Sequence, residues 1–210
     1  MNPVHAAKQS LPTPSPHEQA LERQYDSEPR AQAFYQHQVV DHLNGHMQAF
    51  IQQMSLMFIA TADAEGHCDS SVRAGPPGFV RVLDAHRVAY PEYRGNGVMA
   101  SLANIEDNPH VSLLFIDFAD TAIGLHVNGR AYLAGRGDPS LPQGTPGDPA
   151  AELWVMVTID EAYIHCSKHI PRMTRHDEAI EWGTDDPAKK GGDYFGVSAD
   201  RRRVPEPVRS

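Results

Sequence analysis

A series of short apolar or alternating segments after residue 54 constrains the fold of this chain more than any other feature. The segments are rich in Val, Ile, Phe and Tyr, and they read MFIATAD, FVRVL, RVAY, VSLLFIDF, LHVNGRAYL, LWVMVTI and AYIHC. This composition predicts β-strands. The turn signals that separate them, at residues 63–66, 74–78, 84–86 and 160–161, are too short for helical crossovers. The sequence therefore predicts an antiparallel sheet or a small barrel.

Helices are predicted before and within this series of strands. Between residues 17 and 53, apolar residues recur mostly at spacings of three, four or seven, with Pro29 as an interruption, which predicts two amphipathic helices. A short helix is predicted over residues 100–107, because a glycine-bearing loop precedes it and Asn108 and Pro109 follow it. The glycines and prolines of residues 135–149 predict an irregular connection.

The predicted organisation is one domain with an extension at each end. A chain of 210 residues fits one core better than two. Residues 1–16 carry four prolines among polar residues, which predicts a flexible arm. We expect the domain to span residues 17–185 and a loop-like tail to span residues 186–210.

Charge and composition argue against several functional classes. The net charge is −9, and basic residues are dispersed apart from Arg201, Arg202 and Arg203, so a nucleic-acid partner is not expected. No apolar run approaches the roughly 20 residues that a membrane helix needs, and the first residues do not resemble a secretory signal. We therefore expect a soluble, cytoplasmic protein. Its two cysteines, Cys68 and Cys166, are too few for a disulfide framework or a four-cysteine zinc site.

The first candidate site is the segment RGNGVMAS at residues 94–101. Free amides at a helix N-terminus and the helix dipole favour a bound anion, and glycines permit close approach of the backbone. This pattern predicts a phosphate site. On the pattern alone, an equally good interpretation is that Asn96 caps the helix and the glycines only make the turn.

The second candidate site is the segment SSVR at residues 70–73, followed by GPPGFVR at residues 75–81. Hydroxyl and guanidinium groups on neighbouring strands can give charge-assisted hydrogen bonds to a phosphate. Strand alternation places Ser71 and Arg73 on one face. The alternative is that these residues form only the solvated face of a strand.

Two groups of histidine and cysteine residues are candidate metal ligands. His165, Cys166 and His169 lie close in sequence but lack an evident fourth ligand, and a strand-to-turn arrangement would separate their side chains. His42 and His46 share a predicted helix face, where surface histidines are the simpler interpretation. We expect no metal site.

Three segments together resemble the pyridoxamine 5'-phosphate oxidase-like family of FMN-binding split-barrel flavoproteins. They read DSSVRAGPPGFVRVLD, YPEYRGNGVMASLANIEDNPHVSLLFIDF and GLHVNGRAYL, and the resemblance covers roughly residues 55–134. A further segment, AYIHCSKHIPRM, is similar to one that follows the last barrel strand in an uncharacterised branch of the family. The arginine-lysine pair expected at the helix start is replaced around Ala100 and Ser101, so vitamin B6 oxidation is not expected.

The resemblance implies a mainly β, α+β fold: a six-stranded antiparallel split β-barrel of Greek-key type with N-terminal helices and a short helix after the phosphate-binding loop. It also implies a homodimer that binds FMN at the subunit interface. The expected activity is hydride or electron transfer between FMN and a small organic substrate or a nicotinamide reductant. The alternatives are an F420-dependent reductase and a non-catalytic flavin- or haem-binding protein.

The resemblance further implies which residues form the cofactor site, although no catalytic residue is assigned. The residues on the strand side are Ser71, Arg73, Phe79, Val80 and Arg81. Those on the helix side are Asn96, Ser101 and Asn104. The backbone of Pro91 and Tyr93 would approach the flavin. His126, His165 and Lys168 are speculative candidates near the ring or the substrate. Apart from the resemblance, Trp182 could cover a planar ring from the partner subunit, and an equally good interpretation is that it only packs the C-terminal tail onto the barrel.

Overall fold

The protein contains one antiparallel sheet of seven strands. The computed structural model describes residues 13–135, 137–138, 141, 151–174, 176, 180–189 and 192–199. The strands are β1 (Leu56–Ala62), β2 (Cys68–Ala74), β3 (Arg81–Asp84), β4 (Arg87–Tyr93), β5 (His110–Ile116), β6 (Gly124–Ala134) and β7 (Ala151–His165), and their order in the sheet is β2-β1-β5-β6-β7-β4-β3. The predicted fold class is confirmed, with seven strands in place of the expected six.

One predicted turn is wrong, because the residues assigned to it lie within strand β7. The sequence predicted two strands separated at Asp160 and Glu161, but β7 runs without interruption through both residues. Glu161 pairs with Asn128 and Ile159 pairs with Gly129, so Asp160 is the extra residue of a bulge. A bulge accommodates a polar insertion while the strand continues, which explains why the turn signal was misleading.

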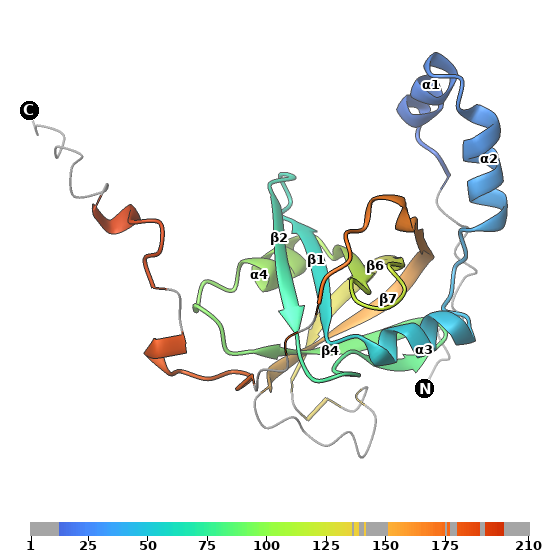
Figure 1. Ribbon diagram of the computed structural model, residues 1–210. Coiled ribbons are helices and arrows are strands. Elements are labelled where there is room, and N and C mark those ends of the chain that lie inside the picture. Colours follow the sequence, from blue (N-terminus) through green and yellow to red (C-terminus); the bar gives the residue numbers. More distant parts are fainter. Residues whose placement is uncertain are drawn as a thin grey trace, which may run out of the picture.

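In the described part of the chain, four α-helices accompany the sheet: α1 (Pro16–Gln24), α2 (Glu28–His37), α3 (Gly45–Gln53) and α4 (Ala100–Asp107). Residues 17–53 therefore form three helices where two were predicted, because a second break, at residues 38–44, separates α2 from α3. Pro29, predicted as an interruption, lies in the first turn of α2, a position that tolerates proline. Helices α1 and α2 bury no residue, and α1 stands away from the sheet (Figure 1). Helix α2 contacts β7 through the ring of Phe34, which meets the Tyr163 ring edge-on with centroids 5.5 Å apart. None of the described helices is long and apolar enough to cross a membrane.

The predicted helix at residues 100–107 is confirmed as α4, which lies beside β1 and β2 (Figure 1). Its residues Leu102 and Ile105 are buried, as is Ile51 of α3. These side chains join the apolar faces of the strands in one core, whose buried members include Ile59, Val88, Leu113, Phe115, Val127 and Val157. Two short 3-10 turns follow β7, namely η1 (Ser167–His169) and η2 (Pro187–Lys189).

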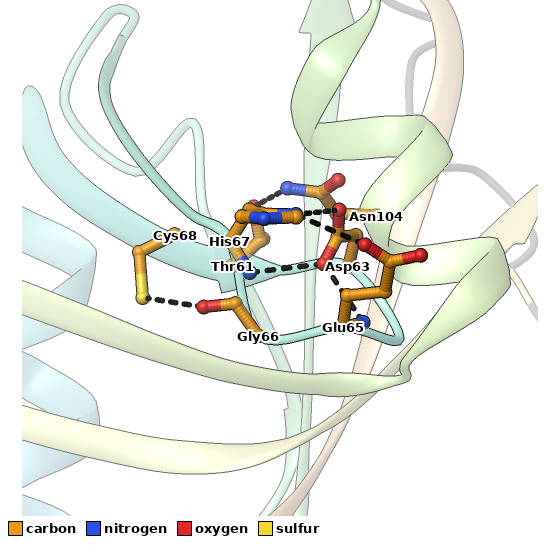
Figure 2. A network of polar contacts seen from close by, with 7 residues as sticks. All are labelled: Thr61, Asp63, Glu65, Gly66, His67, Cys68 and Asn104. Atoms are coloured by element: carbon orange, nitrogen blue, oxygen red, sulfur yellow. Dashed lines mark hydrogen bonds and ion pairs between the residues drawn. The ribbon is translucent and has the colours of Figure 1, made fainter.

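The predicted turn at residues 63–66 joins β1 and β2 in a hairpin. Asp63 accepts hydrogen bonds from the backbone N–H groups of Glu65 and His67, and from the His67 ring at 2.9 Å (Figure 2). The His67 hydrogen bond lowers the pKa of Asp63 below its ordinary value. Gly66 adopts a φ of +87°, which glycine reaches without strain. This turn sets the register of β2, which carries the candidate site.

Several predicted segments lie outside the described residues. These are residues 1–12 of the predicted arm, most of the connection at 135–149, and Arg201, Arg202 and Arg203.

Candidate functional site

A cavity of about 830 Å³ lies between β2, β4 and the start of α4. The loop that leads into α4 forms one wall, and Glu152 of β7 and Asp185 complete the lining. Five residues that the sequence assigned to a cofactor site line this cavity, namely Ser71, Arg73, Tyr93, Asn96 and Ser101. The fold therefore brings the two candidate phosphate segments, one on a strand and one at a helix start, to the same place.

A chain of hydrogen bonds connects β2 to α4 along the cavity wall. Arg73 Nη1 donates to Ser71 Oγ at 2.8 Å, and Ser101 Oγ donates to Asp69 Oδ2 at 2.7 Å. The two serine oxygens lie 3.2 Å apart. Because the single hydroxyl hydrogen of Ser101 points to Asp69, Ser71 must donate to Ser101. The hydrogens thus run in one direction, from the guanidinium to the carboxylate.

Arg73 is also held by an ion pair from the opposite wall. Its Nε lies 2.8 Å from a carboxylate oxygen of Glu92, and the two side chains are only 17% and 15% exposed. Burial raises the pKa of Glu92 above its ordinary value, the Arg73 guanidinium partly offsets that rise, and the nearby carboxylate of Glu152 adds to it. A positive charge is therefore fixed at the cavity and partly neutralised there.

The loop before α4 has an irregular backbone that faces the cavity. Asn96 accepts a hydrogen bond from Val98 N at 3.0 Å, so its side chain caps this turn and not the helix. Gly97 has a φ of +82° and Met99, the residue that precedes α4, has a φ of 55°. Since Met99 provides no side-chain cap, the first amides of α4 are not bonded by an N-cap side chain.

The segment after β7 borders the same cavity. Trp182 stacks on Tyr93, with ring centroids 6.3 Å apart and planes at 23°. Arg94 Nη1 lies 2.6 Å from a carboxylate oxygen of Asp185. An aromatic pair and an ion pair therefore attach this segment to the cavity rim, where a planar ring could contact the aromatic pair.

Other residues in the predicted cofactor site lie away from the cavity lining. Phe79 and Val80 are buried in the core, and Arg81 is an exposed residue at the start of β3. Pro91 is buried in β4, where it pairs with Trp154 of β7.

Asn104 also faces away from the cavity. Its side-chain amide donates to the buried Thr61 hydroxyl at 3.1 Å, which attaches α4 to β1 (Figure 2). This contact gives Asn104 a role in positioning the helix on which Ser101 lies.

The histidines proposed near the ring lie on β6 and β7, outside the cavity lining. His126 Nε2 is 2.9 Å from His165 Nδ1, and the His126 ring stacks on Tyr163 with centroids 4.7 Å apart. Burial lowers the pKa of His126 below its ordinary value, and His165 lowers it further. Lys168 is exposed in η1. Within the described ranges, no group of three or more potential metal ligands lies together.

Two residues at the centre of the site, Asp69 and Glu92, were not singled out from the sequence. Asp69 could have been found, because alternation along β2 places it on the same face as Ser71 and Arg73. Glu92 carries no local signal, since its contact with Arg73 depends on how the sheet closes. The same holds for Glu152 and Asp185, which come from distant segments.

Comparison with known proteins gives one family and several solved structures. Residues 43–166 match the family model described as pyridoxamine 5'-phosphate oxidase. Similar structures include HupZ of Group A Streptococcus, with 23% identity over 58% of this chain and 93% of that chain, and a TM-score of 0.43. HutZ, the heme storage protein from Vibrio cholerae, has 16% identity over 58% and 94%, with a TM-score of 0.40. An F420 reductase has 15% identity over 59% and 98%, with a TM-score of 0.38. No curated protein matches this chain.

Proposed function

Because this chain belongs to the pyridoxamine 5'-phosphate oxidase family, we propose that it is an FMN-dependent oxidoreductase whose cofactor binds in the cavity beside α4. The observation that carries this proposal is the convergence of Arg73, Ser71 and Ser101 at the uncapped start of that helix. A guanidinium group, two hydroxyls and free helix amides form a donor set suited to a phosphate.

The size and the rim of the cavity also fit a flavin mononucleotide. A volume of about 830 Å³ lies within the range of sites for ligands of this size. Tyr93 and Trp182 form an aromatic pair at the rim, and Val98 and Met99 add apolar surface against which a planar ring can pack. Donors for a phosphate and apolar groups for a planar ring therefore lie along one cavity and its rim.

In this proposal the protein binds and orients, and the cofactor carries the redox chemistry. When bound, the isoalloxazine ring supplies hydride or electron transfer, so no protein nucleophile is needed. Arg73 and the two serines fix the phosphate, while Tyr93 and Trp182 limit water access to the ring. Small organic molecules or a nicotinamide reductant are the proposed substrates, and Ala100 and Ser101 at the helix start argue against vitamin B6 oxidation.

We further propose that the chain acts as a homodimer with the cofactor at the subunit interface. Apolar side chains are exposed beside the cavity: Val98 is 70% exposed, Met99 54% and Val72 51%. Apolar groups gathered at a rim are typical of surfaces that a partner covers. Sedimentation of the purified protein should give twice the mass of one chain, and a monomer at micromolar concentration would contradict the proposal.

The first test is to identify the cofactor of the purified protein. An absorbance spectrum is recorded, the protein is then denatured, and the released molecule is identified by mass. FMN is the expected result. F420 or haem would replace this proposal with one of the two alternatives, a deazaflavin-dependent reductase or a cofactor-binding protein. The absence of any ligand, together with failure to bind added FMN, would exclude a flavoenzyme.

A matched pair of arginine variants then tests the location of the site. Arg73→Ala should weaken FMN binding by about 100-fold, because it removes the charge at the phosphate end. Arg87→Ala is the control, since Arg87 is exposed and pairs with Asp84 at the β3–β4 turn. Equal affinities for the two variants would place the phosphate elsewhere.

A further inference from the structure

We propose that Asp69 and Glu92 act as internal competitors of the ligand's phosphate, so that a phosphate binds by displacing Asp69 from Ser101 and by sharing Arg73 with Glu92. This inference rests on the proposed function and concerns the regulation of the same site. Both carboxylates line the cavity, and each already contacts one of the groups that would hold a phosphate.

The competition at the serines concerns hydrogen atoms. The hydroxyl hydrogen of Ser101 is donated to Asp69, and that of Ser71 is donated to Ser101. A phosphate oxygen is an acceptor, so it cannot bond to either hydroxyl while this arrangement persists. At least Ser101 must turn away from Asp69 before it can donate to the ligand. A phosphate bond from Ser101 therefore costs a charge-assisted bond to Asp69, and one from Ser71 costs its bond to the Ser101 hydroxyl.

The competition at Arg73 concerns charge. Its Nε donates to Glu92 and its Nη1 donates to Ser71 and to the carbonyl oxygen of Val72, whereas Nη2 has no acceptor among the described residues. A phosphate oxygen can therefore meet Nη2 while Nε remains on Glu92. The guanidinium would then lie between two anions, and its attraction for the phosphate would be reduced by Glu92.

The charges around the cavity strengthen this conclusion. Among the described residues, the lining carries more carboxylates than guanidinium groups: it includes Asp69, Glu92, Glu152 and Asp185 but only Arg73 and Arg94. A pocket built only to hold a phosphate would have the opposite balance. The carboxylates keep the donors ordered before a ligand arrives. They also make the affinity for a phosphate lower than the same donors would give without them.

The phosphate can be isolated by comparing FMN with riboflavin, which has the same ring and no phosphate. The purified chain, freed of bound cofactor, is titrated with each flavin, and binding is followed by calorimetry. The variants are Asp69→Asn and Glu92→Gln, each of which removes one competing charge and keeps the shape of the side chain. Glu152→Gln is the matched control, because Glu152 lies in the same lining but makes no bond to Arg73, Ser71 or Ser101 among the described residues.

We expect Asp69→Asn and Glu92→Gln to bind FMN at least about fivefold more tightly than the natural chain, because a charged acceptor is replaced by a weaker neutral one. Their riboflavin affinity should stay within about twofold. Glu152→Gln should tighten FMN binding less than either of them, because it lowers the negative charge of the lining without freeing a donor. Unchanged or weaker FMN binding by a folded Asp69→Asn protein would overturn the inference and make Asp69 a residue that supports the site.

Two further outcomes remain decisive. Glu92→Gln leaves Arg73 without its ion-pair partner, so this variant could fail to fold. Thermal unfolding is therefore measured for each variant. If Glu92→Gln does not fold, the FMN affinity of Asp69→Asn alone tests the inference. If no variant binds FMN, the proposed function fails, and inorganic phosphate then tests the inference separately. Stronger thermal protection of Asp69→Asn than of the natural chain by phosphate would support it, and equal protection would overturn it.

Discussion

Arg73 on the first strand of the sheet and Glu92 on the sixth form an ion pair of 2.8 Å. In the described structure, β2 forms a backbone ladder only with β1, and β4 only with β3 and β7. Side chains therefore join β2 and β4, two strands that share no backbone ladder with each other. The same contact closes the barrel and positions the charge of the candidate phosphate site.

The first prediction is that Arg73 and Glu92 stabilise the fold as a unit. Arg73→Met and Glu92→Met should each lower the free energy of unfolding by about 2 kcal/mol, because each leaves a partly buried charge without its partner. The double variant should be more stable than the sum of the single effects predicts, since it buries neither charge. Urea unfolding of all four proteins measures this coupling, and additive effects would contradict it.

The second prediction concerns Gly129 on β6, which lies opposite the bulge at Asp160 of β7. A Cβ added at Gly129 would lie 2.1 Å from the Thr158 carbonyl oxygen, so the backbone must move to admit it. Gly129→Ala should lower the free energy of unfolding by about 2 kcal/mol or more. Gly45→Ala is the control, because a Cβ there meets no atom within 4 Å. Equal stability of the two variants would show that the bulge relaxes at little cost.

The third prediction follows from Asp117, which closes the turn after β5. Burial raises its pKa, but hydrogen bonds from the backbone of Asp120, from the Thr121 side chain and from the backbone of Thr121 and Ala119 outweigh burial and lower the pKa to about 2. A carboxyl with a lowered pKa stabilises the fold above its unfolded pKa of about 4, and this contribution is lost as the pH falls through about 2.

Asp117→Asn should therefore destabilise the protein by about 1 kcal/mol at pH 7, after allowance for solvent screening, and much less near pH 2. Urea unfolding as a function of pH provides the measurement. If the free energies of unfolding of Asp117→Asn and the natural chain differ by the same amount from pH 7 to pH 2, the effect comes from the shape of the side chain and not from its charge.

The fourth prediction concerns His126, whose pKa is lowered by burial and by His165. A histidine with a lowered pKa is neutral in the fold, so its contribution to stability is present above the unfolded value near 6.5 and is lost as the pH falls through the folded value. The His126 ring should titrate below pH 6.5 by NMR. His126→Gln should reduce the loss of stability on acidification, whereas substitution of the exposed His37 should not. A midpoint above 6.5 would contradict this assignment.

The elements and the local turns could largely be predicted from the sequence. Alternating Val, Ile and Phe residues identified the strands, and Asn108 and Pro109 marked the end of α4, because these signals act within a few residues. The failures were also local. The break between α2 and α3 at residues 38–44 was not predicted, and Asp160 with Glu161 were interpreted as a turn when Asp160 forms a bulge. In the second case, acidic residues that are common in turns lie within a strand.

The sequence by itself determined most of the strands and helices, and it identified Ser71, Arg73, Asn96 and Ser101 as polar groups that could bind a phosphate. Only the tertiary structure decided that these residues share one cavity, that Asn104 and His126 lie outside its lining, and that Asp69 and Glu92 lie inside it. Strand periodicity fixes the face on which a side chain lies, because it depends on neighbouring residues. The contact between Arg73 and Glu92 depends instead on closure of the whole sheet, which no short segment encodes.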